Sequence, residues 1–248
     1  MAGHSKWKNI QHRKGAQDAK RGKAFTKLIK EVTVAVKTGG SDVDSNPRLR
    51  LAVQNCRGAN MPKDNIERAI KKADGAGGSN FQEVTFEGYG PDGVAIFVET
   101  ATDNNTRTVA SVRSYFKKYN GNLGKDGCLE FIFNRKAVFS LSNEKIDEEE
   151  FTLEMIDASA EDVEFDGDIV TITTEMEYFG DVQKKLNELN LETIEAGLQR
   201  IPTTTKEIKT DNFKTFMKLI NILEEDDDVQ KVYHNVEFSE ELFNSLES

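Results

Sequence analysis

Residues 74–80 read Asp-Gly-Ala-Gly-Gly-Ser-Asn, and this short stretch divides the chain into two parts of opposite charge. Its three glycines give the backbone the freedom of a linker. Residues 1–74, the basic segment, contain 17 Lys and Arg against 7 Asp and Glu, a net charge of +10. Residues 75–248, the acidic body, contain 16 against 36, a net charge of −20. The overall charge of −10 therefore averages two unlike parts, a pattern typical of a polyanion-binding segment joined to an acidic body.

The composition describes a globular protein with enough chain for one or two domains. Of the 248 residues, 37% are apolar, which suffices for a core without covalent cross-links. The two cysteines, Cys56 and Cys128, lie far apart and outside any metal-ligand spacing, so we expect neither a disulfide framework nor a zinc site. No apolar run approaches the roughly 20 residues that span a bilayer, and no signal peptide opens the chain. We expect a cytoplasmic protein without a membrane partner.

The basic segment has the apolar spacing of three amphipathic helices. Residues 24–36 carry the first apolar stripe, a second helix is expected to begin with Asn46 as its N-cap, and a third follows Pro62 with Asn60 or Met61 as its cap. Because each stripe needs a partner, we predict a helical bundle with a basic exterior. The cations expected on that exterior include Lys20, Lys23, Lys27, Lys30, Arg68, Lys71 and Lys72.

The N-terminal end of the basic segment has the composition of a nucleic-acid-binding arm. Residues 1–23 contain seven Lys and Arg but only one acidic residue, Asp18, whereas a merely solvated helix face mixes both signs. Cationic groups neutralise phosphates and release counterions, and Trp7 offers a surface on which an unpaired base can stack. The residues predicted to contact nucleic acid are Lys6, Trp7, Lys8, His12, Arg13, Lys14, Lys20, Arg21, Lys23, Lys27, Lys30, Arg48, Arg50, Lys63 and Arg68.

The acidic body opens with two predicted strands, residues 81–87 and 94–99, joined by a GxGxxG sequence at residues 88–93. In a dinucleotide-binding fold a helix must follow the last glycine, and here a strand follows instead. The kinase version requires a strand lysine and the HRD and DFG motifs, which do not follow. We therefore predict a hairpin turn without a bound phosphate.

The rest of the acidic body predicts an α+β fold. A helix is expected from Asp103-Asn104 to Lys118, and residues 129–201 then give the order strand, helix, strand, strand, helix, strand, which is typical of a ferredoxin-like unit. A last helix and strand, within residues 213–236, can return to the first sheet, which makes the ferredoxin-like unit an insertion. The predicted domains are a basic helical domain (1–78), an α+β domain (79–128 plus 206–248) and an inserted ferredoxin-like domain (129–205).

We find no catalytic constellation in the sequence. The acidic runs 147–150 and 224–228 lack the spacing of a calcium loop and are expected to be solvated, and His234 is expected to be structural. We predict no enzymatic activity, cofactor, metal or small-molecule substrate. An alternative of another class is a metal-dependent phosphodiesterase built from clustered carboxylates. These would be Glu99, Asp103 and Asp126.

Several of these segments together resemble the YebC/PmpR family, whose mitochondrial relatives are translational activators of a cytochrome oxidase subunit. The matching motifs are residues 1–7 (MAGHSKW), 12–14 (HRK), 17–23 (QDAKRGK), 25–29 (FTKLI), 46–50 (NPRLR), 60–70 (NMPKDNIERAI) and 87–94 (EGYGPDGV). The resemblance implies three domains, with the ferredoxin-like third inserted into the second. Two loops depart from the family: residues 102–107 lack a usual arginine, and Gly-Cys-Leu at 127–129 replaces Gly-Ser-Val.

The resemblance implies a cytoplasmic, DNA-binding transcriptional regulator. The alternative, also found in the family, is a ribosome-associated factor that binds rRNA or tRNA and aids the synthesis of proline-rich sequences. The basic segment offers few side chains set to read base edges in a major groove, so phosphate and shape contacts fit structured RNA at least as well. A protein-interaction scaffold built on the acidic body is the remaining alternative.

Overall fold

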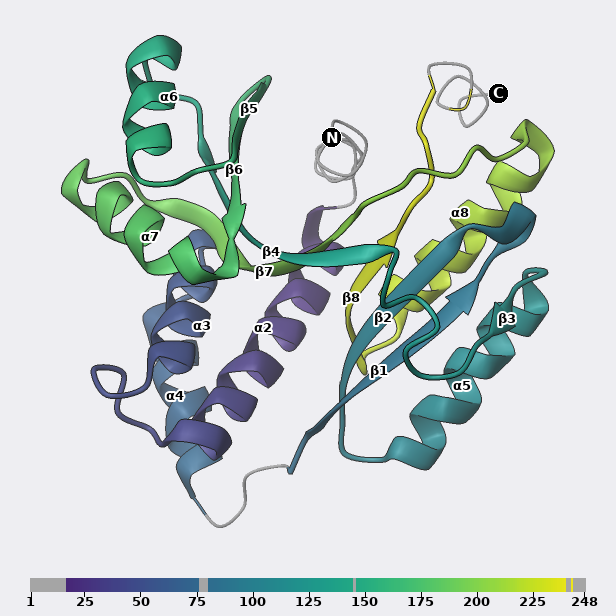
Figure 1. Ribbon diagram of the computed structural model, residues 1–248. Helices are drawn as coiled ribbons and strands as arrows, with labels where there is room; N and C mark the ends of the chain where they lie inside the picture. Colours follow the sequence, from purple (N-terminus) through teal and green to yellow (C-terminus); the bar gives the residue numbers. More distant parts are fainter. Residues whose placement is uncertain (1–16, 76–79, 145, 240–241, 243–248) are drawn as a thin grey trace.

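The computed structural model describes residues 17–75, 80–144, 146–239 and 242, and it places a helical domain beside two four-stranded sheets (Figure 1). The helical domain consists of α2 (Gln17–Gly39), α3 (Pro47–Gly58) and α4 (Lys63–Asp74). Their apolar stripes meet in one core, which includes Val32, Leu49, Cys56 and Ile66. The predicted bundle is therefore present. No helix in the described ranges is both long and apolar enough to cross a membrane.

The helix starts show where sequence signals succeed and fail. Asn46 caps α3 as predicted, because its side chain accepts a hydrogen bond from the backbone N–H of Leu49 at 3.1 Å. The predicted cap of α4 at Asn60 or Met61 is wrong, since Pro62 directly precedes the helix and no side chain caps it. Asn60 instead adopts a left-handed φ of 57° and turns the chain between α3 and α4.

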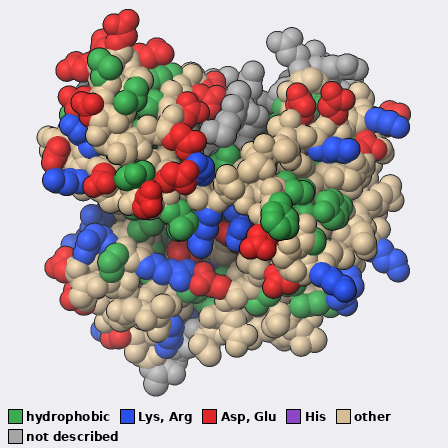
Figure 2. Space-filling model, viewed as in Figure 1, with side chains coloured by type: hydrophobic (Ala, Val, Ile, Leu, Met, Phe, Trp, Pro, Cys, Tyr) green, Lys and Arg blue, Asp and Glu red, His purple; other side chains and the backbone are tan. Residues whose placement is uncertain are grey.

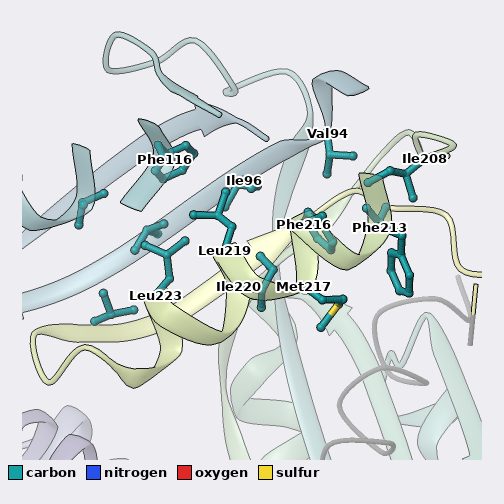
Figure 3. Close-up of a cluster of buried hydrophobic side chains, with 14 of the residues drawn as sticks. Val94, Ile96, Phe116, Ile208, Phe213, Phe216, Met217, Leu219, Ile220 and Leu223 are labelled. Atoms are coloured by element: carbon teal, nitrogen blue, oxygen red, sulfur yellow. The ribbon is translucent and has the colours of Figure 1, made fainter. Parts of the chain in front are cut away.

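The second domain is a sheet covered on one face by two helices (Figure 1). Its strands are β1 (Gln82–Tyr89), β2 (Ala95–Thr102), β3 (Asn122–Leu123) and β8 (Val229–His234), in the order β3-β1-β2-β8. The helices are α5 (Asn105–Lys118) and α8 (Thr210–Glu225). Figure 3 shows the core between them and the sheet, where Phe116 of α5 and Phe216 of α8 join Ile96 of β2. A 3-10 turn, Pro91–Gly93, connects β1 and β2, so the GxGxxG sequence forms the predicted hairpin turn.

The third domain is the ferredoxin-like unit, inserted between β3 and α8. Its elements are β4 (Phe133–Ser142), α6 (Glu148–Asp157), β5 (Asp162–Asp166), β6 (Ile169–Glu175), a 3-10 turn (Met176–Tyr178), α7 (Phe179–Glu188) and β7 (Thr193–Pro202). The strand order is β5-β6-β4-β7, and every neighbouring pair is antiparallel. After the insertion the chain returns as β8, which pairs with β2. The predicted element order is confirmed, except that β4 begins at Phe133 because residues 129–132 form a turn.

The helical domain is attached to the inserted domain through α3 and the edge strand β7. The side-chain amide of Asn55 donates to the carbonyl of Ala196 at 2.8 Å and accepts from its N–H at 2.9 Å, while Gln54 donates to Thr193 Oγ1 at 2.7 Å. An edge strand otherwise exposes such backbone groups to unwanted pairing. The same contact brings Gly58 against the β7 backbone so closely that a Cβ there would lie 2.8 Å from the carbonyl oxygen of Thr193.

This close approach predicts a strong effect of Gly58→Ala. Because the added methyl group would meet backbone atoms, which cannot rotate away, we expect the free energy of unfolding to fall by roughly 1–3 kcal/mol. The matched control is Gly22→Ala in α2, where none of the described residues would lie within 4 Å of the added methyl group and the better helix former should raise stability by roughly 0.5–1 kcal/mol. Urea unfolding followed by circular dichroism measures both; changes of the same sign would contradict the close α3–β7 contact.

Candidate nucleic-acid interface

Part of the predicted interface lies outside the described residues. These residues are Lys6, Trp7, Lys8, His12, Arg13 and Lys14. Lys20 belongs to α2, but its side chain is likewise outside the described part of the structure. A role for these seven residues in nucleic-acid binding stays a prediction.

α2 turns part of its basic face toward the second domain. Lys23 Nζ donates to the backbone carbonyl of Glu225 at 3.2 Å, and Lys27 Nζ donates to that of Glu224 at 2.9 Å. Burial lowers the pKa of Lys27, and the attraction of the Glu224 carboxylate only partly offsets that burial. The last carbonyl oxygens of α8 have no hydrogen-bond donor within the helix. The two lysines donate hydrogen bonds to them, and their positive charges are favourable at this end of the helix dipole.

Lys30 lies deeper in the same contact. It is only 9% exposed, and its Nζ donates to Asp228 Oδ1 at 2.9 Å. It also donates to the backbone carbonyls of Asp227, at 2.7 Å, and Ala101, at 3.3 Å. The predicted place of Lys30 on the basic exterior is therefore wrong. The reason is that the turn before β8 presents a buried carboxylate and carbonyl oxygens, which are costly to leave without a donor.

The carboxylate of Asp228 connects this lysine to the second domain. Its Oδ2 accepts from Arg107 Nη2 at 2.6 Å and from Thr108 Oγ1 at 2.9 Å, while Oδ1 accepts from Lys30. Burial by itself raises the pKa of Asp228, but the hydrogen bonds from Arg107, Lys30 and Thr108 outweigh it and bring the pKa to about 2. The prediction that residues 224–228 form a wholly solvated acidic run is thus wrong for Asp228, which is 6% exposed.

Arg48 forms a second connection between domains. Its guanidinium reaches Glu83 Oε1 at 2.6 Å and Glu31 Oε1 at 3.1 Å, which joins α3 to α2 and to the first strand of the second domain. The hydrogen bonds that Arg48 donates to Glu83 raise the pKa of Arg48, and the same bonds lower the pKa of Glu83. Arg48 is therefore engaged with two carboxylates, and it would have to exchange one of them for a phosphate to bind nucleic acid.

The other predicted cations of the helical domain remain on the surface. Arg21, Arg50 and Arg68 are exposed and donate to backbone carbonyls of nearby residues. Lys63 is exposed and makes an i,i+4 ion pair with Glu67 at 3.4 Å. Exposed contacts of this kind contribute little free energy, so a phosphate can replace them. These side chains are accessible to a polyanion.

Four further cations of the helical domain are exposed, and within the described residues they form no ion pair. They are Lys37, Arg57, Lys71 and Lys72. The position of Lys71 and Lys72 on the polar face of α4 confirms the amphipathic spacing. Lys37 and Arg57 are not among the cations predicted from the sequence to be on the exterior. Their positions beside the apolar stripes of α2 and α3 are the sequence feature that indicates such exposure. The free positive charge of this domain is thus distributed over all three helices.

The groups proposed for the alternative catalytic site do not converge. Glu99 pairs with Arg200 at 3.2 Å, and Asp103 pairs with Arg107 at 2.9 Å. In the described ranges, no group of three or more His, Cys, Asp and Glu side chains is placed to hold a metal ion. His234 is 2% exposed and packs edge-on against two phenylalanine rings, which agrees with a structural histidine.

The Asp228 cluster predicts a marked effect of Asp228→Asn. Removing one member of a buried ion pair leaves Lys30 buried beside a neutral amide, and we expect the free energy of unfolding to fall by roughly 3–5 kcal/mol. Urea unfolding measures this, and the exposed neighbour Asp227, replaced by Asn, is the control, for which we expect a change below about 0.5 kcal/mol.

The same substitution predicts a pH dependence. Because the pKa of Asp228 falls from 3.8 to about 2 on folding, its stabilising effect is present above about pH 4 and is lost as the pH falls through 2. The difference in unfolding free energy between the parent chain and Asp228→Asn should therefore shrink as the pH falls from 4 to 2. A difference that stays constant over that range would contradict the assignment.

Two family models match the chain. One, described as the TACO1/YebC protein N-terminal domain, matches residues 5–76, which include the helical domain. The other, described as the TACO1/YebC second and third domain, matches residues 81–236, which include both sheets. The boundary between the two models falls on the glycine-rich stretch.

Known relatives resemble the chain over nearly their whole length. A protein of Amoebophilus asiaticus is 52% identical over 239 residues, which cover 95% of this chain and 98% of the relative. One of Geobacillus is 50% identical over 242 residues, covering 96% and 98%. Both bear the name "probable transcriptional regulatory protein". The crystal structure of a conserved hypothetical protein from Aquifex aeolicus matches with a TM-score of 0.83 and 42% identity, covering 90% of this chain and 93% of that one. On these grounds the chain belongs to the TACO1/YebC family.

Proposed function

We propose that this protein is a non-enzymatic, cytoplasmic regulator of gene expression that binds nucleic acid through its basic segment. The observation that carries the proposal is the separation of charge, with +10 on 74 residues and −20 on the other 174. Phosphate neutralisation by such a segment supplies affinity independent of sequence. The names of the relatives support a regulator of transcription, and the proposed partner is therefore DNA.

The contacts divide the cations of the basic segment into two groups. Lys23, Lys27, Lys30 and Arg48 hold the helical domain against the second domain. We assign phosphate contacts to residues 1–16 of the N-terminal arm, which precede α2, and to the exposed cations of the three helices. Because the structural group is engaged in the folded chain, the accessible cations supply the binding energy. The arm adds Trp7, an aromatic surface for base stacking.

A second candidate function, binding of ribosomal or transfer RNA as a translation factor, is favoured by one observation. α3 carries Gln54 and Asn55, the amide side chains suited to reading adenine in a major groove. The side-chain amides of both residues are hydrogen-bonded to β7, so these amide groups are not free to hydrogen-bond to the bases of a nucleic acid. The helical domain thus favours contacts with phosphates and with nucleic-acid shape, which is how proteins recognise structured RNA.

Neutralising the arm tests the common part of both functions. Replacement of Lys6, Lys8, Arg13 and Lys14 by Ala should reduce the slope of log affinity against log salt by up to about 3.6, at roughly 0.9 per phosphate contact on duplex DNA. Fluorescence anisotropy with labelled duplex DNA and structured RNA at several salt concentrations measures the slope. The control, Lys184→Glu with Lys206→Glu, removes the same charge from exposed positions elsewhere. An arm variant whose slope equals that of the parent chain would overturn the proposal.

Crosslinking in growing cells separates the two functions. If the protein regulates transcription, sequencing of the bound nucleic acid should recover promoter DNA. If it acts in translation, the same experiment should recover ribosomal or transfer RNA. Incubation of labelled RNA and DNA with the protein and Mg²⁺ or Mn²⁺ should leave both intact, and turnover would instead support the phosphodiesterase.

A further inference from the structure

Among the described residues of the acidic body, the two helices of the second domain carry exposed cations. α5 and α8 pack against the same face of the sheet and lie next to each other (Figure 1). The cations Arg113 and Lys117 of α5 and Lys214 and Lys218 of α8 are all exposed. We call these four residues the α5–α8 cations. α5 contains no acidic residue, and α8 has only Asp211 before its C-terminal end.

The α5–α8 cations differ from the cations of the inserted domain in their partners. That domain has 19 Asp and Glu against 6 Lys and Arg in residues 129–205, and Figure 2 shows acidic side chains gathered over it. Four of its cations are held in ion pairs: Lys136, Lys184, Lys185 and Arg200. By contrast, none of the α5–α8 cations has an ion-pair partner among the described residues. The acidic body therefore leaves this surface unneutralised.

The spacing of the α5–α8 cations is unfavourable for the free protein. Arg113 and Lys117 are separated by four residues on one helix, and so are Lys214 and Lys218, which places like charges next to each other on the surface. Elsewhere the same spacing separates the exposed like charges Arg68 and Lys72 of α4, and it also occurs in three pairs of opposite charge. These pairs are Lys63–Glu67, Asp103–Arg107 and Lys184–Glu188. A polyanion bound at this surface would relieve the repulsion within both pairs.

The helix dipole does not explain these positions. A cation is favourable in the last turn of a helix, and Lys117 meets that condition in α5. Arg113 lies in the middle of α5, while Lys214 and Lys218 lie in the first half and the middle of α8. Cations there gain nothing from the dipole, which acts within the terminal turns. The dipole therefore accounts for the position of Lys117 alone.

We propose that the α5–α8 cations form a second contact for the sugar-phosphate backbone of a nucleic acid, in addition to the basic segment; this inference rests on the proposed function. Because α5 and α8 are in contact, the two pairs lie on neighbouring helices, and one polyanion would bind both. The C-terminal end of α8 touches α2 through Lys23 and Lys27, which connects this surface to the basic segment. A nucleic acid on both surfaces would bridge the first two domains.

Two double variants test the proposal in the full chain. Arg113→Ala with Lys117→Ala, and Lys214→Ala with Lys218→Ala, each remove two charges and should each reduce the salt slope for duplex DNA by about 1.8. Lys184→Glu, at an exposed position on α7, lowers the net charge by two as each double variant does, and should leave the slope unchanged. Lys214→Arg with Lys218→Arg retains the charge and should retain the slope. Urea unfolding of each variant confirms that the fold is kept.

The outcomes separate this inference from the proposed function. If the arm variant lowers the slope and both double variants keep the parent slope, the α5–α8 contact is wrong and the proposed function stands. If the parent chain binds neither duplex DNA nor structured RNA, both are overturned. The binding of the parent chain and of both double variants to vesicles of phosphatidylserine and phosphatidylcholine is measured as a further comparison. Vesicle binding that the double variants abolish, with an unchanged DNA slope, would assign the surface to an anionic membrane instead.

Discussion

The buried carboxylate of Asp228 is the constraint on which the arrangement of the first two domains depends. A buried carboxylate is tolerated only when donors surround it, and here they come from α2 and α5. Lys30 and Arg107 reach it from opposite sides of the domain boundary. The position of α2 against the sheet of the second domain is thus fixed by charge and hydrogen bonding as well as by apolar packing. Replacement of Asp228 by a neutral residue would leave the buried Lys30 without its counter-charge.

This constraint divides the basic segment into structural and accessible cations. Lysines on one side of α2 supply hydrogen bonds to the end of α8, and Arg48 joins two carboxylates, while α4 keeps its lysines in solvent. A high positive charge therefore does not mean that every cation serves binding. α2 can both hold two domains together and contribute to a polyanion-binding surface. Its Lys23 and Lys27 contact the end of α8, whereas its Lys37 is exposed to solvent.

The acidic body has a physical role consistent with the proposed function. A strongly cationic segment by itself would bind any polyanion, and a covalently attached negative domain opposes such binding through long-range repulsion. The inserted domain carries most of this negative charge and pairs three of its own lysines, Lys136, Lys184 and Lys185, with its carboxylates. The α5–α8 cations stand apart from this pattern, so the charge of the body is organised by domain.

The sequence by itself determined the element order, the antiparallel hairpin at the glycine-rich loop, the cap at Asn46 and the helical spacing of the apolar residues. These features depend on local backbone chemistry and on periodicity, which are legible in one chain. Only the tertiary structure decided which cations are available. Lys27, Lys30 and Lys72 look alike in sequence, yet the first two meet residues 224–228 from the other end of the chain and the third meets solvent. Likewise, nothing in the sequence distinguishes Asn55 from other polar residues of α3. In the folded chain it lies beside the edge strand β7 and forms hydrogen bonds with the backbone of Ala196. A side chain's role is set by its neighbours in space, and those neighbours are distant in sequence.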